Sequence, residues 1–97
     1  METKINAIHF DISEKLTSFI NKKIDKLTRR YPNVMSAEVS LRVVKPETAL
    51  NKEAIVSLIV PQEPDQVATK TADTFEEAID LCTEALDRQL EKVKNKK

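Results

Sequence analysis

The chain has 97 residues, 40% hydrophobic and 33% charged, which favours one globular domain spanning residues 1–97 over a disordered segment. Sixteen basic and sixteen acidic residues cancel, so net charge alone identifies no partner. No apolar run approaches the roughly 20 residues of a membrane helix, the N-terminus lacks a signal-peptide pattern, and the single cysteine excludes an internal disulfide. We therefore expect a cytoplasmic protein with no membrane partner.

The first half of the chain predicts a strand, a helix and a second strand. Residues 3–10 are rich in apolar side chains, which favours a short strand. Asp11 followed by Glu14 resembles a capping box, and apolar residues then recur every three or four positions, which indicates an amphipathic helix. Pro32 should end that helix. Apolar and polar residues alternate over 37–43, the pattern of a strand with one face in water.

The second half predicts two more strands and a second helix. A polar loop over 45–52 leads into a strongly apolar strand at 54–60, and a weaker strand at 66–72 should lie near a sheet edge. Asp73 and Glu76 repeat the helix-start pattern. A long apolar stripe of helical period follows them. Because the chain has no glycine, its turns should rely on Pro, Asn and Asp.

The predicted order β-α-β-β-β-α defines the fold class as α+β. Three consecutive strands with short connections should form an antiparallel meander, and two helices with one apolar stripe each should bury those stripes against one face of the sheet. We expect a two-layer sandwich, a four-stranded sheet with both helices on one face. Lys4, Arg42 and Lys70 are expected on the open face, to which the sequence assigns no role.

The residues that carry chemistry in enzymes are sparse, and we expect no catalytic activity, no metal and no cofactor. His9 has no Ser or Cys partner at motif spacing. Cys82 falls on the apolar stripe of the second helix, which predicts a buried, inert thiol. One His and one Cys do not make a zinc site, and the carboxylates of the second helix look like a solvated face.

The basic residues are segregated along the chain. Residues 1–45 hold nine Lys and Arg against five acids, and residues 46–97 hold seven against eleven. On the first helix, six cations fall within an arc of about 120° that contains no acid. A solvated face is the alternative interpretation, with the last cations complementing the helix dipole. The six are Lys15, Lys22, Lys23, Lys26, Arg29 and Arg30.

The second helix also sorts its charges. Arg88, Lys92 and Lys96 recur every four residues, Lys94 and Lys97 extend the basic end, and acids fill the neighbouring arc. If the helices lie side by side, the two cationic stripes can merge into one surface that suits the phosphates of structured RNA. Stacking platforms for bases are nearly absent. A tail that only keeps the protein in solution is the alternative.

Two long segments resemble the ribosome hibernation factors, a family also known as sigma-54 modulation proteins. They read "HFDISEKLTSFINKKIDKLTRRYPNVMSAEVSL" and "DTFEEAIDLCTEALDRQLEKVKNKK". The most specific part runs from the Asp-x-Phe-x-x-Ala-Ile-Asp motif at residues 73–80 into the Leu-x-Arg-Gln-Leu-x-Lys-x-Lys-x-Lys pattern at 86–96. The resemblance covers nearly the whole chain.

The resemblance implies a fold like that of double-stranded-RNA-binding domains and a non-enzymatic function. Such a protein binds the small ribosomal subunit in the mRNA/tRNA channel, against 16S rRNA and neighbouring ribosomal proteins, and sterically blocks translation in stationary phase or stress. It implies no small-molecule substrate, and we expect a monomer off the ribosome. The RNA-binding residues it implies are Lys22, Lys23, Lys26, Arg29, Arg30, Arg88, Lys92, Lys94 and Lys96.

Several departures from the family pattern bear on affinity. Ala85 stands where relatives often have Lys, and Glu84, Asp87 and Glu91 make the second helix more acidic, which predicts weaker electrostatic attachment. Because the chain ends at Lys97, the short type without an added C-terminal domain is the expected match. Two alternatives stay open: a protein-interaction module that modulates transcription through a sigma factor, and a general binder of structured RNA.

Overall fold

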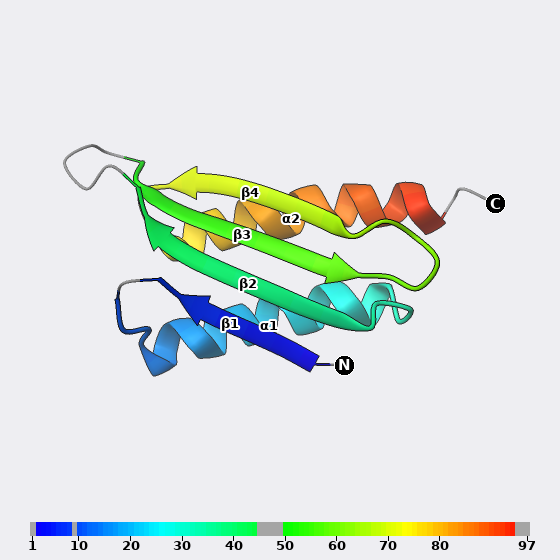
Figure 1. Ribbon diagram of the computed structural model, residues 1–97, viewed down its shortest axis with the longest axis horizontal. Coiled ribbons are helices and arrows are strands. Elements are labelled where there is room, and N and C mark those ends of the chain that lie inside the picture. Colours follow the sequence, from blue (N-terminus) through cyan, green and yellow to red (C-terminus); the bar gives the residue numbers. More distant parts are fainter. Residues whose placement is uncertain (1, 9, 45–49, 95–97) are drawn as a thin grey trace.

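The computed structural model describes residues 2–8, 10–44 and 50–94, so His9, the loop residues 45–49, Lys96 and Lys97 lie outside the described residues. Figure 1 shows the predicted β-α-β-β-β-α order, which is confirmed. Its elements are β1 (Glu2–Ala7), α1 (Glu14–Arg30), β2 (Ser36–Val43), β3 (Lys52–Ile59), β4 (Gln66–Ala72) and α2 (Phe75–Lys94).

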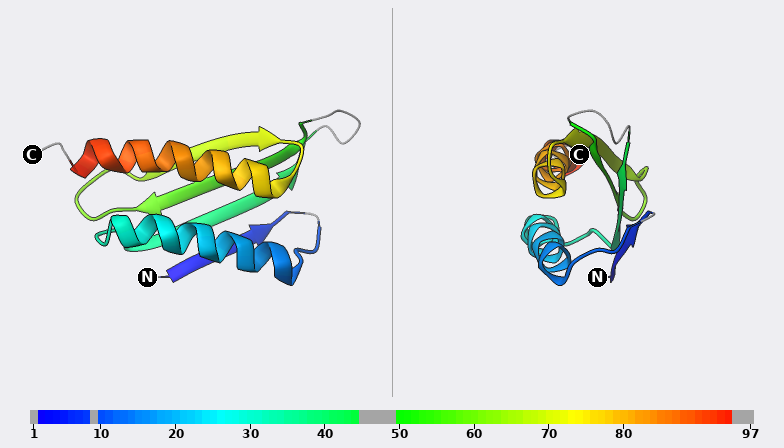
Figure 2. Two further views of the ribbon diagram at one scale, coloured as in Figure 1. Left: turned by 180° about the vertical axis from the view of Figure 1, so that it is seen from behind. Right: turned by 90° about the vertical axis from the view of Figure 1, so that its left-hand side faces the viewer.

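The four strands form one sheet in the order β1-β2-β3-β4. The predicted antiparallel meander of β2, β3 and β4 is confirmed, with β4 at one edge, while β1 pairs parallel with β2 at the other. Both helices cover the same face of the sheet and leave the other face open, as the end-on view in Figure 2 shows. This arrangement is the predicted two-layer α+β sandwich.

The strand register sorts the side chains between the two faces of the sheet. Val39 lies opposite Val56, which lies opposite Ala68, and all three are buried beneath the helices. Because successive strand residues alternate in direction, Arg42 points to the open face, as expected, where it pairs with Glu53. The expectation for Lys70 was wrong. Its register partner is Ala54, a core residue, so Lys70 lies on the helix side of the edge strand β4.

The core lies between the sheet and the helices. Side chains with no exposed area come from both layers, and each large one stabilises the fold by roughly 1.5–3 kcal/mol. At one end, the rings of Phe10 and Phe75 stack with centroids 4.9 Å apart, which joins the segment before α1 to the start of α2. The largest fully buried core side chains include Ile20, Ile24, Val39, Leu41, Val56, Leu58, Ile79 and Leu86.

Cys82 is buried in this core, as predicted. Its thiol donates to the carbonyl oxygen of Ala54 at 3.4 Å and to that of Ala68 at 3.6 Å. Burial, which removes water from the thiolate, raises the pKa of Cys82 to about 11. A thiol that stays protonated is a poor nucleophile, so the side chain acts as a small core residue.

Both helix starts are capped by hydroxyl groups and not by the predicted aspartates. Ser13 has an extended backbone, and its Oγ accepts a hydrogen bond of 3.1 Å from the N–H of Leu16. Asp11 lies two residues too early for that geometry. Thr74 caps α2, because its Oγ1 accepts from the N–H of Glu77 at 3.1 Å.

The Asp73 carboxylate does not cap α2 but binds the loop before β3. It accepts a hydrogen bond of 3.0 Å from the backbone N–H of Leu50, whose φ of 55° lies in the left-handed region. Gln62, in the turn after β3, also has a positive φ, of 66°. The expectation that turns would rely on Pro, Asn and Asp was therefore incomplete, since a chain without glycine places ordinary side chains in this costly conformation.

Candidate nucleic-acid interface

The helix layer presents the predicted cations, because α1 and α2 lie side by side on the outside of the sandwich (Figure 2). The buried residues of α1 lie on one side of the helix, and Lys22 and Lys26 point outward from the opposite half into solvent. Lys23 and Arg30 lie on the flank that faces α2, as their contacts below show. The cations predicted to share one arc of α1 do lie on one side of the helix. Within that arc, some point into solvent and others face α2.

The flank of α2 that faces α1 is acidic. Asp80 and Asp87 are seven residues apart, close to two turns, and share one side of the helix. The Nζ of Lys23 lies 2.7 Å from Oδ1 of Asp80, and Nη1 of Arg30 lies 2.8 Å from Oδ2 of Asp87. The two cationic stripes therefore do not merge, and that expectation was wrong. A row of carboxylates separates them.

Tyr31 fixes the second of these contacts. Its hydroxyl donates to Oδ1 of Asp87 at 2.7 Å and approaches the backbone carbonyl of Asp87 at 3.2 Å, while the Arg30 guanidinium carbon lies 5.6 Å from the ring centre. Burial, and then the bond to the Asp87 carboxylate, raise the pKa of Tyr31. With 5% of its surface exposed, this ring is not available to stack on a base.

A groove of about 370 Å³ runs between the helices. Its charged lining comprises three cations from α1 and three carboxylates from α2, so the groove is neutral and does not attract phosphate along its whole length. Thr83 and Leu27 complete the lining. The charged residues are Lys23, Lys26, Arg30, Asp80, Glu84 and Asp87.

The cations of α2 lie away from this groove. At about 100° per residue, Arg88 and Lys92 fall on the outer side of the helix, beyond the flank that carries Asp87. The Nε2 of Gln89 donates to the carbonyl oxygen of Val67 at 3.1 Å, which turns the flank after Arg88 toward the edge strand β4. Arg88 and Lys92 are exposed. Lys94 is the last residue of α2.

The remaining cations divide into paired and unpaired groups. Arg29 forms an ion pair of 2.7 Å with Asp25, one helical turn away on α1. Among the side chains that the structure describes, which do not include that of Lys94, the exposed cations of the helix layer that make no ion pair form the set available to an external anion. That set is Lys15, Lys22, Lys26, Arg88 and Lys92.

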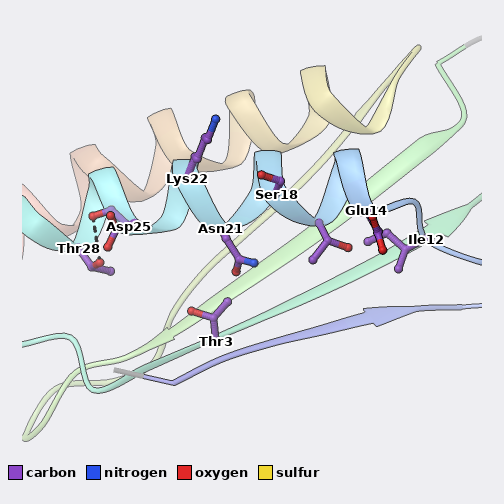
Figure 3. A pocket seen from close by; sticks show the side chains of 9 residues that line it. Thr3, Ile12, Glu14, Ser18, Asn21, Lys22, Asp25 and Thr28 are labelled. Atoms are coloured by element: carbon purple, nitrogen blue, oxygen red, sulfur yellow. Dashed lines mark hydrogen bonds between the residues drawn. The ribbon is translucent and has the colours of Figure 1, made fainter.

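A second cleft, of about 730 Å³, lies between α1 and β1. Figure 3 shows Thr3 of β1 below Asn21 of α1, with Lys22 pointing away from the strand. None of the side chains that line this cleft is buried, so it lacks the buried polar group that marks a specific ligand site.

Among the described residues, no group of three or more His, Cys, Asp or Glu is placed to hold a metal ion. No helix in this part of the chain is long and apolar enough to cross a membrane.

The ion pairs between the two helices were not predicted. The acidic arc of α2 was recognised, but its place against α1 was not. The available signal was the spacing of seven between Asp80 and Asp87, matched by seven between Lys23 and Arg30. Equal spacing on two neighbouring helices lets both pairs form at once.

Comparison with known proteins identifies one family, and the relatives described below share one name. The family model described as "Sigma 54 modulation protein / S30EA ribosomal protein" matches residues 3–97. A "Ribosome hibernation promoting factor" from Azotobacter vinelandii is 29% identical over 96 residues, which cover 99% of this chain and 85% of that protein. A protein of the same name from Pseudomonas putida is 25% identical over 96 residues, covering 99% of this chain and 89% of its own length.

Two solved structures share the fold. A ribosomal subunit interface protein from Coxiella burnetii matches with a TM-score of 0.87 at 21% identity, over 98% of this chain and 99% of that one. The N-terminal domain of Protein Y from Thermus thermophilus matches with a TM-score of 0.80 at 18% identity, over 96% and 99% of the two chains.

Proposed function

This chain belongs to the sigma 54 modulation protein / S30EA ribosomal protein family, and we propose that it is a ribosome hibernation factor that binds the small ribosomal subunit and blocks translation. Its target is 16S rRNA and the adjoining ribosomal proteins in the channel used by mRNA and tRNA. Because ribosomes are the target, the same proposal places the chain in the cytoplasm. It acts by occupying space and needs no catalytic group.

The observation that supports the proposal most strongly is the set of five unpaired, exposed cations on the helix layer, in a chain of this family. Lys15, Lys22 and Lys26 on α1, with Arg88 and Lys92 on α2, make no ion pair within the described residues. Lys and Arg on a folded surface bind RNA phosphates and release counterions. A cationic surface without aromatic rings for base stacking is better suited to the backbone of a structured RNA than to unpaired bases.

The paired cations enter the proposal in a second role. Lys23, Arg29 and Arg30 each hold a carboxylate already, at 2.7, 2.7 and 2.8 Å. A phosphate that approaches one of them competes with that carboxylate. We therefore assign the primary contacts to the unpaired cations and weaker contacts to Lys23, Arg29 and Arg30. Lys94 and Lys96 remain proposed contacts because they match the family pattern.

Blocking is steric. The domain is packed around one core, with Cα extents of 46 × 23 × 18 Å, and the two helices are joined by buried apolar contacts and by the Tyr31–Asp87 bond. A rigid body bound in the channel excludes mRNA and tRNA by volume. Because binding is held mainly by phosphate contacts, it should weaken as salt rises.

Competition on isolated small subunits tests this function. Subunits preloaded with mRNA and tRNA should bind the chain far less than empty subunits at the same salt concentration. Equal binding to both would contradict a site in the channel. A pulldown from starved cells adds an independent arm. The pulldown should recover 16S rRNA. If a sigma factor dominated the recovered material, the alternative of a protein-interaction module that modulates transcription would be favoured.

A further inference from the structure

The ion pairs made by the acids between the two cationic rows do little for stability. The side chains of Lys23 and Asp80 are 36% and 45% exposed, and those of Arg30 and Asp87 are 60% and 34% exposed. Exposed ion pairs of this kind contribute little to stability, because water and salt screen them. Glu84 lines the same groove and is exposed. Three carboxylates therefore occupy the middle of a surface that is proposed to bind RNA.

Their position works against a uniform row of phosphates. A polyanion laid along the groove would place phosphates beside Asp80, Glu84 and Asp87 as well as beside the cations. Each phosphate that reached Lys23 or Arg30 would have to approach a carboxylate already within 2.8 Å of that cation. Like charges set face to face are a means of excluding a wrong partner.

We propose that Asp80, Glu84 and Asp87 form a selectivity row that prevents the helix layer from binding plain duplex RNA. The inference rests on the proposed function and concerns the choice among RNA partners. A suitable target presents phosphates over the outer rows, at Lys15 and Lys22 on one side and Arg88 and Lys92 on the other. Over the acids it presents no phosphate. A regular duplex bound with one strand along the groove does not satisfy this pattern, because the phosphates of that strand are evenly spaced.

The matched experiment compares two triple variants with the same change in net charge. In the row variant, Asp80→Asn, Glu84→Gln and Asp87→Asn remove the three carboxylates, and the amide introduced by Asp87→Asn keeps an oxygen that accepts from Tyr31. In the control, Glu2→Gln, Glu38→Gln and Asp65→Asn remove three exposed carboxylates outside the groove. Thermal unfolding verifies that each variant is folded.

Affinity is measured for a duplex RNA of arbitrary sequence and for small subunits, at one salt concentration. The row variant should bind the duplex about tenfold more tightly than the unmodified chain, and the control should gain less than about threefold because its charges are distant. Affinity of the row variant for small subunits should rise by less than about threefold, because the subunit uses Lys23 and Arg30 only for weaker contacts. The preference for subunits over duplex therefore falls in the row variant alone.

Equal gains in both variants, or no gain in the row variant, would overturn the selectivity row. If the row variant does not fold, Glu84→Gln against Glu38→Gln gives the comparison at matched charge, because Glu84 is exposed and makes no ion pair among the described residues. Failure of the unmodified chain to bind small subunits would overturn the proposed function instead, and the duplex comparison would still decide the role of the acids.

Discussion

The Tyr31 hydroxyl, at the end of α1, donates a hydrogen bond of 2.7 Å to the Asp87 carboxylate in α2. The same carboxylate holds the Arg30 guanidinium at 2.8 Å. Arg30 and Tyr31 are neighbours in the sequence, so one acid receives two donors from one end of α1. This contact sets the position of α1 beside α2 where their charged flanks meet.

Removing the Tyr31 hydroxyl should destabilise the protein. Tyr31→Phe keeps the buried ring and deletes the donor, so we expect the free energy of unfolding in urea to fall by about 1 kcal/mol. In a double-mutant cycle with Asp87→Ala, the two losses should not add, because both variants break the same bond. Strictly additive losses would mean that the bond contributes nothing in solution.

The helix cap can be tested with two alanine variants. Ser13→Ala removes the acceptor for the N–H of Leu16 and should cost about 1 kcal/mol in the free energy of unfolding. Asp11→Ala is the control, since Asp11 is exposed and precedes the cap, and it should change stability by less than about 0.5 kcal/mol. A larger loss of stability for Asp11→Ala than for Ser13→Ala would support the capping box at Asp11 that the sequence suggested.

Stability should fall in alkaline solution because of Cys82. The folded protein holds the thiol proton up to a pKa of about 11, whereas the unfolded chain releases it near the ordinary value of 9.0. Between these values the unfolded state binds fewer protons, so the free energy of unfolding falls as pH rises, by up to about 3 kcal/mol in total. Below pH 9 the contribution is complete and constant.

The control for this pH dependence is Cys82→Ala, which lacks the titrating group. Tyr31, whose pKa is also raised, contributes the same sign in both proteins, so the difference between the two curves isolates Cys82. That difference should be flat below pH 9 and decline above it. A flat difference up to pH 11 would show that the thiol ionises equally well in the folded state.

The fold was predictable from the sequence because its signals are local. Periods of 3.6 and 2 residues identified both helices and the strands, and Cys82 was placed in the core from its position on an apolar stripe. The caps were misplaced because Asp, Ser and Thr are nearly equivalent as N-caps. Backbone geometry, and not residue type, selects Ser13 and Thr74.

The site was predictable only in part, because its arrangement depends on which helix flanks meet. The sequence identified the cations of each helix as a group. It did not show that Lys23 and Arg30 face Asp80 and Asp87, because the relative rotation of two helices is set by ridge-and-groove packing over the sheet. Lys70 was assigned to the wrong face for a separate reason, which lies in the alternation of the strand. A shift of one position in strand register reverses every side chain.

The most direct test of the account reverses one unpaired cation on each helix. Lys26→Glu with Arg88→Glu should weaken co-sedimentation with small subunits by about tenfold or more, because phosphate contacts become repulsions. Lys4→Glu with Arg42→Glu makes the same change in net charge at exposed positions on the open face of the sheet and should leave binding nearly unchanged. Equal losses in the two variants, or undiminished binding of the first, would contradict an RNA interface on the helix layer.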